Sequence, residues 1–278
     1  MHGSVNLARL FELHHIYSFY YKAYLERGIN LALDPNDFQN RLVDEDEKAH
    51  YFEVGADAIR LVLNELLRGR RTIPRTILDF PCGAGRVTRH LRAFFPQSRI
   101  VACDLYDHHV KFCVRELGVE GMGSKENFDE LDFGLQFDLI FCGSLLTHLP
   151  EEHYRPVIRL LSRSLTAQGI AIVTLLGRHS EYAQKHKWKY LDDSLFAIAE
   201  ATVAQTGFGF VDYDYAIRSK FDQQAHYGIT LSRPHWILRI AEEDYGIRLL
   251  NFIERGWDDH QDVLVIGKPP INDPDMFS

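Results

Sequence analysis

The chain of 278 residues has no long hydrophobic run, no excess of basic residues and few cysteines. No apolar run approaches the roughly 18 residues of a membrane span. Residues 1–15 contain charged and histidine residues where a signal peptide needs its apolar stretch. The 31 Lys and Arg residues against 39 Asp and Glu residues give a net charge of −8, which disfavours a general nucleic-acid binder. The four cysteines show no CxxC spacing, so we expect no disulfide framework and a soluble, cytoplasmic protein.

The order of apolar patterns predicts an α/β protein. Residues 1–70 look helical, and their second half has apolar residues at helical spacing until Pro74. After that, short apolar runs alternate with helical stretches, which is typical of a parallel sheet with crossover helices. We predict strands at 76–80, 99–103, 118–123, 137–142, 169–175, 247–254 and 262–267, and helices at 85–95, 107–117, 151–165, 191–206 and from Pro234.

These elements predict a doubly wound, Rossmann-like sheet of seven mainly parallel strands. Residues 1–70 are interpreted as a helical N-terminal cap, and residues 71–278 as the main domain. Residues 178–231 interrupt the alternation after the fifth strand, and they are rich in aromatic residues, glycine and histidine. We interpret them as an insertion that covers a substrate.

The most informative segment is a glycine turn between a strand and a helix. Gly83 and Gly85 let the backbone approach a ligand closely at the start of the helix. Asp104 ends the next strand, nineteen residues after Gly85, where a nucleotide-binding sheet places the acid that binds the ribose. A helix N-cap is the alternative role for Asp104. Thr88 stands at the third glycine position of a dinucleotide fingerprint, which argues against a nicotinamide cofactor.

The sequence Asp79-Phe-Pro-Cys-Gly-Ala-Gly85 resembles motif I of the class I S-adenosylmethionine-dependent methyltransferases, with Pro81 in place of the first glycine. Residues 137–149 resemble the fourth-strand motif of that superfamily, and residues 165–173 resemble the turn and strand that follow. More narrowly, the chain is similar to a group of bacterial methyltransferases often associated with glycosyltransferases. That likeness rests on residues 80–87, 143–149, 227–228 and 254–262.

The resemblance implies S-adenosylmethionine as cofactor and S-adenosylhomocysteine as product. No cluster of Asp, Asn and His has the spacing of a catalytic divalent-metal site, so we expect no metal. The resemblance places Asp79, Gly83 and Gly85 around the methionyl part, and Cys142 and Gly143 close beneath the sulfonium. It also implies that Asp104 binds the ribose, that Leu105 flanks the adenine, and that Ser124 stands where an acid commonly meets the adenine amine.

A hydroxyl acceptor needs a general base, most often His, Asp or Glu. The candidate catalytic residues are His260, His148 and Tyr227, with His226 and Asp262 also considered. For each of them, packing or an exposed turn is the alternative explanation. We expect O-methylation of a small molecule or glycan, and neither nucleic-acid binding nor a membrane span. A nicotinamide-dependent oxidoreductase and a cofactor-binding interaction protein without catalysis remain the competing classes, and the oligomeric state stays open.

Overall fold

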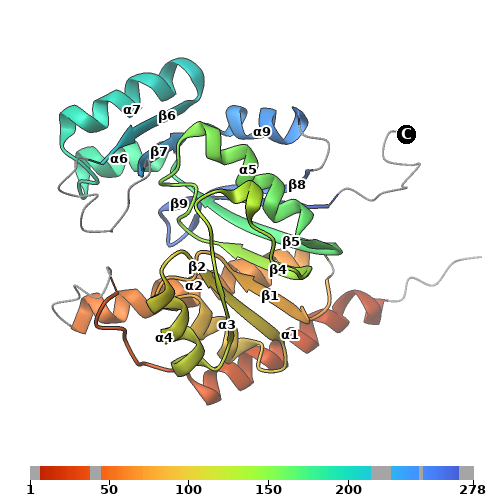
Figure 1. The fold of residues 1–278 in the computed structure, drawn as a ribbon. Helices are drawn as coiled ribbons and strands as arrows, with labels where there is room; N and C mark the ends of the chain where they lie inside the picture. The colour runs from red at the N-terminus through yellow and green to blue at the C-terminus, as the bar shows by residue number, and fades with distance from the viewer. Residues whose placement is uncertain (1–6, 38–44, 70, 214–226, 244–246, 269–278) are drawn as a thin grey trace, which may run out of the picture.

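The computed structural model describes residues 7–37, 45–69, 71–213, 227–243 and 247–268, and its centre is a twisted seven-stranded sheet (Figure 1). Five strands are parallel, whereas β9 is antiparallel to β5 and β8 is antiparallel to β9. The mixed α/β, Rossmann-like architecture predicted from the sequence is confirmed. The strand order is β3 (Glu120–Gly123), β2 (Arg99–Asp104), β1 (Thr76–Asp79), β4 (Phe137–Cys142), β5 (Leu165–Leu175), β9 (Gln261–Gly267) and β8 (Arg248–Trp257).

Helices pack against both faces of the sheet, as its continuous apolar strands require. Successive strand residues point to opposite faces, so Ile77 packs in one hydrophobic cluster and Leu78 in the other. The cluster around Ile77 includes residues of α1 (Leu7–Arg27), α2 (Glu45–Arg68), α3 (Thr88–Phe94) and α4 (Asp107–Leu117). The cluster around Leu78 includes residues of the short helix η1 (Phe128–Glu130), α5 (Glu151–Arg163) and α9 (Pro234–Glu243).

The segment after β5 forms a group of elements with a hydrophobic cluster of its own. Its strands pair antiparallel in a separate two-stranded sheet, and the group lies to one side of the main sheet (Figure 1). Phe196 and Leu231 are buried inside this cluster. The elements are α6 (Arg178–His186), α7 (Asp193–Thr206), β6 (Phe208–Asp212) and β7 (Gly228–Ser232).

Among the boundaries that differ from the sequence prediction, two have a local reason. The helix predicted to begin at residue 85 begins at Thr88, because Gly83 and Gly85 adopt positive φ angles of 49° and 77° in the preceding turn. Strand β5 begins at Leu165, ahead of the predicted residue 169, and its pairing with β4 shifts register between Phe137 and Leu139. Among the described helices, none is long and apolar enough to cross a membrane.

Candidate functional site

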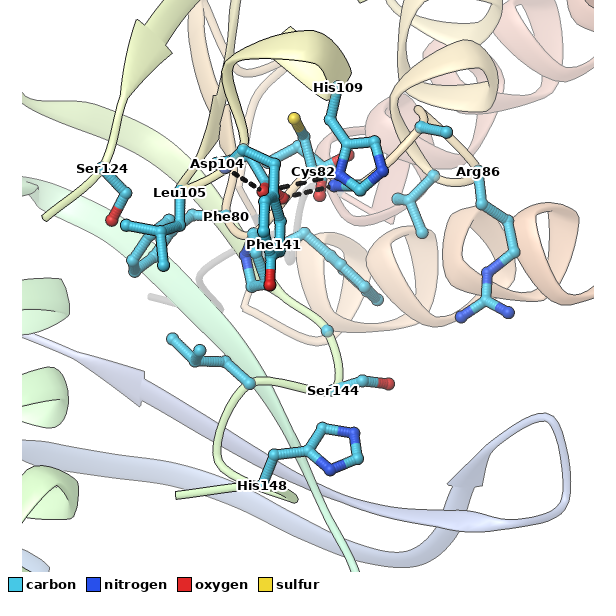
Figure 2. Close-up of a pocket in the computed structure, with 18 of the residues that line it drawn as sticks. Phe80, Cys82, Arg86, Asp104, Leu105, His109, Ser124, Phe141, Ser144 and His148 are labelled. Atoms are coloured by element: carbon cyan, nitrogen blue, oxygen red, sulfur yellow. Dashed lines mark hydrogen bonds and ion pairs between the residues drawn. The ribbon is translucent and has the colours of Figure 1, made fainter. Parts of the chain in front are cut away.

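A cavity of about 510 Å³ lies at the carboxyl ends of β1, β2 and β4 (Figure 2). The strand order reverses between β1 and β4, and such a reversal opens a crevice where open α/β sheets bind ligands. The volume falls within the range of about 300–1,000 Å³ that is typical of small-molecule sites. This position makes the cavity the candidate active site.

The two glycines of the turn differ in what surrounds them. Gly83 lines the cavity, and nothing lies within 4 Å of the position that a Cβ atom would occupy. Its backbone therefore leaves room for a ligand. A Cβ atom at Gly85 would lie 2.5 Å from Leu117 Cδ1 and 3.1 Å from Cys113 Sγ. Gly85 is therefore required for packing of the turn against α4, and it lies behind the cavity lining.

Asp104 joins the two loops at the edge of the cavity. Its Oδ2 accepts a hydrogen bond of 2.8 Å from Gly83 N, and its Oδ1 accepts one of 2.9 Å from Tyr106 N. The N-cap of α4 is Tyr106, so Asp104 does not occupy the capping position that was its alternative role. Leu105 is 40% exposed beside it, and the Ser124 backbone donates to the Asp104 carbonyl.

Asp79 is buried at the end of β1, with 2% of its surface exposed. Burial raises the pKa of this carboxyl to about 7, while a hydrogen bond from Thr88 opposes the shift. The Thr88 Oγ1 donates that bond to Asp79 Oδ2 at 2.5 Å. Asp79 therefore changes its charge close to neutral pH inside the cavity.

His148 lies in the cavity wall just after β4 (Figure 2). Its Nδ1 is 2.8 Å from the Gly228 carbonyl oxygen, which only accepts hydrogen bonds, so Nδ1 carries the proton. Burial lowers the pKa of His148 to about 4, which keeps the ring neutral. The lone pair is therefore on Nε2, and this atom forms no hydrogen bond with any residue that the structure describes.

Comparison with known proteins agrees with this geometry. Residues 77–169 match the family model of a methyltransferase domain. The matched residues make up about a third of the chain. A curated relative, the malonyl-[acyl-carrier protein] O-methyltransferase of Bacillus cereus, is 26% identical over 159 residues. That match covers 57% of this chain and 57% of the relative, so the chain spans just over half the length of the curated protein it matches.

Two solved structures share the fold of this chain. One is an S-adenosylmethionine-dependent methyltransferase from Clostridium acetobutylicum, with a TM-score of 0.51 and 13% identity over 83% of this chain and 94% of the other. The second is a protein from Pyrococcus horikoshii, with a TM-score of 0.52 and 14% identity over 77% of this chain and 91% of the other. At 13% and 14% identity these two likenesses show the fold alone, and S-adenosylmethionine is the cofactor that the resemblance of residues 79–85 to motif I implies.

The residues around the cavity fit that cofactor in size and polarity. The acid Asp104 lies at the end of β2, the open turn at Gly83 lies next to it, and Leu105 offers an exposed apolar surface. Ser124 also lines the cavity, and so does Glu126, two residues beyond it. Glu126 is thus a candidate for the acid that the resemblance leads one to expect at Ser124, and sequence reasoning missed it because the acid is displaced along the loop.

Of Cys142 and Gly143, the two residues predicted to lie beneath the sulfonium, only Gly143 lines the cavity. Gly143 and Phe141 line it, whereas Cys142 is fully buried in the cluster on the other face of the sheet. The alternation of side chains along a strand explains the difference. All four cysteines are free and buried, which agrees with the expectation of no disulfide framework.

Tyr227 lines the cavity next to His148, with ring centroids 4.8 Å apart. Tyr213 also reaches this wall, and its hydroxyl lies 3.2 Å from His148 Nδ1. Both tyrosines border the segment 214–226, which contains the predicted candidate His226 and lies outside the described residues.

His260 lies outside the cavity, in a cluster of aromatic rings on the insertion. The Tyr190 hydroxyl is 2.9 Å from His260 Nε2, and the two rings are stacked at 5.8 Å. Burial, with the nearby His179 and Lys187, lowers the pKa of His260 to about 4. Asp262 is buried behind the same turn, where its Oδ1 accepts a hydrogen bond from Arg255 N. The structure therefore brings His148 and Tyr227 together but not His260 or Asp262.

Two residues of the cavity come from parts of the chain that local sequence patterns do not connect with the glycine turn. Tyr51 of α2 and Trp257 of β8 line it, as does Arg86, which directly follows the turn. Trp257 is 2% exposed, and its Nε1 donates a hydrogen bond to the Val54 carbonyl oxygen. The indole thus points into the core toward α2. Its position depends on a long-range contact that no local pattern reveals.

Proposed function

We propose that this methyltransferase domain transfers a methyl group from S-adenosylmethionine to a hydroxyl oxygen of a small molecule or glycan. The observation that carries the proposal is the unprotonated Nε2 of His148 in the same cavity as Asp104. One residue is suited to accept the proton of a hydroxyl group, and the other is suited to hold a ribose.

The cofactor half of the cavity is assigned to the residues that end β1 and β2. Asp104 would accept hydrogen bonds from the ribose hydroxyls, and Leu105 would cover the adenine ring. Asp79, Gly83 and Gly143 would surround the methionyl part. When bound, S-adenosylmethionine supplies a methyl group on a positively charged sulfur, which is already a good electrophile. The protein then needs to position and desolvate the reactants.

The other half of the cavity, which we call the acceptor wall, consists of Ser144, Leu145, His148, Tyr213 and Tyr227. The wall is aromatic and hydroxyl-bearing. Its histidine is neutral at pH 7, because burial keeps its pKa low, and the other four side chains carry no charge there. An uncharged acceptor with ring-like faces matches this surface, whereas a protonated amine would gain no ion pair from these five residues. This chemistry favours O-methylation.

The role proposed for His148 follows from its hydrogen bond. Gly228 O fixes the Nδ1–H tautomer, so Nε2 is the atom that accepts the acceptor's proton. A neutral imidazole with a pKa of about 4 is available as a base throughout the physiological range. The catalytic rate constant should therefore be nearly constant between about pH 6 and 8, and it should fall only where His148 becomes protonated.

Choice of the acceptor is assigned to the helical segment 1–70 and to the insertion 178–231. The first contributes Tyr51 to the cavity, and the second contributes Tyr213 and Tyr227. Aromatic side chains of this kind suit the faces of a sugar or a phenolic compound.

Calorimetry with S-adenosylmethionine, S-adenosylhomocysteine and NADH tests the cofactor directly. We expect micromolar binding of the two sulfur ligands and no response to NADH. Tight binding of NADH without binding of either sulfur ligand would overturn the proposal. A screen of acceptor pools with isotope-labelled S-adenosylmethionine then identifies the methylated product.

Once an acceptor is known, the pair His148→Ala and His260→Ala tests the base. Loss of a general base typically costs about a hundredfold or more in rate. We expect that loss for His148→Ala and near-normal turnover for His260→Ala, with cofactor affinity unchanged in both. The reverse ranking would assign the base to His260.

A further inference from the structure

Arg86 follows the glycine turn directly, and its side chain lies in the cavity (Figure 2). Its guanidinium carbon is 5.9 Å from the ring centroid of Tyr51 and 5.4 Å from that of Trp257. The half-buried guanidinium forms no hydrogen bond or ion pair with any residue of the described ranges. The two aromatic rings therefore position a cation whose N–H donors have no acceptor among the described residues.

The neighbouring Arg89 shows how the N–H donors of an arginine with a structural role are paired with acceptors of the protein. Arg89 is 1% exposed, and it donates hydrogen bonds to the backbone carbonyls of Ala84, Gly85, Asn30 and Ala32. Arg89 is part of the core, whereas the N–H groups of the Arg86 guanidinium have no hydrogen-bond partner among the described residues and are available to a ligand.

Withdrawal from water makes an unpaired cation costly, and it lowers the pKa of Arg86. A carboxylate offsets this cost well, because the planar guanidinium can donate two parallel hydrogen bonds to its two oxygens. An anionic ligand group is therefore expected at this position.

The location of Arg86 indicates which anionic group fits. Figure 2 shows Arg86 on the side of the cavity away from Leu105 and Ser124, the residues assigned to the adenine. The acids Asp79 and Asp37 also line the cavity, and their charges act on Arg86. This end therefore presents a cation and carboxylates together, which is the complement of an α-amino acid with its own carboxylate and ammonium groups.

We propose that Arg86, held between Tyr51 and Trp257, binds the carboxylate of the methionyl end of the cofactor. The inference rests on the proposed function and deepens it. It gives helix α2 and strand β8 a part in cofactor binding, because they supply the two rings that fix the guanidinium. It also predicts that the domain distinguishes ligands with the amino-acid end from ligands without it.

The test compares S-adenosylhomocysteine with 5′-methylthioadenosine, which keeps the adenosine and the thioether but lacks the amino acid. In Arg86→Gln, loss of a charge-assisted hydrogen-bond pair should weaken S-adenosylhomocysteine by about ten- to a hundredfold. The affinity for 5′-methylthioadenosine should change by less than about twofold, since no contact to it is lost. Titration calorimetry on the full chain measures both.

Arg86→Lys keeps the charge but not the two-pronged geometry, so it should show a smaller loss for S-adenosylhomocysteine alone. It also keeps the comparison possible if Arg86→Gln does not fold. Arg239→Gln, an exposed change of the same charge on α9, is the matched control and should bind both ligands normally.

Equal weakening of both ligands in the Arg86 variants would overturn the proposal, because it would indicate a general effect on the cavity. Unchanged affinity for S-adenosylhomocysteine would overturn it as well. If the unmodified protein bound neither ligand, the proposed function itself would fail, and that result is distinct from either of these.

Discussion

The Thr88 hydroxyl donates a 2.5 Å hydrogen bond to the buried carboxylate of Asp79. Thr88 occupies the position where a dinucleotide-binding fingerprint has its third glycine, and its side chain is fully buried. The residue that argues against a nicotinamide cofactor therefore has a structural role of its own, because it provides a donor to an acid at the end of β1. This contact links the first turn of α3 to the cavity.

Two substitutions of Thr88 distinguish the contribution of its hydroxyl to stability from the contribution of its side-chain volume. Thr88→Val keeps the shape but leaves Asp79 Oδ2 without its donor, which should destabilise the fold by about 1–3 kcal/mol. Thr88→Ser keeps the hydroxyl and loses one methyl group, at about 1 kcal/mol. Urea unfolding at pH 7 measures both. Equal stability of Thr88→Val and the unmodified protein would show that the hydrogen bond contributes nothing.

Cofactor affinity should depend on pH through Asp79. Its raised pKa of about 7 leaves the carboxyl mostly neutral at pH 6 and mostly ionised at pH 8. Only the ionised form attracts the ammonium group of the methionyl end, so binding of S-adenosylhomocysteine should strengthen severalfold from pH 6 to 8.

Asp79→Asn should remove most of that pH dependence. Binding of 5′-methylthioadenosine serves as the ligand control, because it has no ammonium group to attract. A pH response shared by both ligands would assign the effect to a group other than Asp79.

The sequence predicts the residues of the glycine turn and the following strand much better than the residues that reach the cavity from distant elements. The spacing from Gly85 to Asp104 reflects one strand–turn–helix–strand unit, so local periodicity is enough to place the acid at a strand end. Arg86 needs Tyr51 and Trp257 from two distant elements, and only tertiary packing brings these rings to it. Local sequence patterns do not predict such long-range contacts.

Adjacency in sequence does not bring the candidate His260 to the cavity. His260 shares a polar turn with Trp257, but only Trp257 lines the cavity. Residues 258 and 259 have positive φ angles, so the chain reverses tightly between the two side chains. Trp257 then packs toward α2, and His260 packs against Tyr190 of the insertion.

Asp104→Ala should weaken S-adenosylhomocysteine about tenfold or more, the scale of a lost hydrogen bond to a charged group. The change also releases Gly83 N and Tyr106 N, so the unliganded protein should lose stability as well. Asp107→Ala, an exposed change three residues along the chain, is the matched control. Calorimetry and thermal unfolding measure the two effects. A folded Asp104→Ala with normal affinity would refute the ribose assignment.

Trp257 should be a main stabilising contact between the closing hairpin and α2. Its buried ring packs edge-on against Phe141 at 5.3 Å, so Trp257→Ala should cost about 3–5 kcal/mol of unfolding free energy. Trp257→Phe keeps most of the packing but leaves the Val54 carbonyl without its donor, at about 1–3 kcal/mol. Trp188→Ala removes an indole that is 45% exposed, so it should cost far less. Urea unfolding of the three variants gives the ranking, and similar losses for Trp188→Ala and Trp257→Ala would contradict the role assigned to the buried indole.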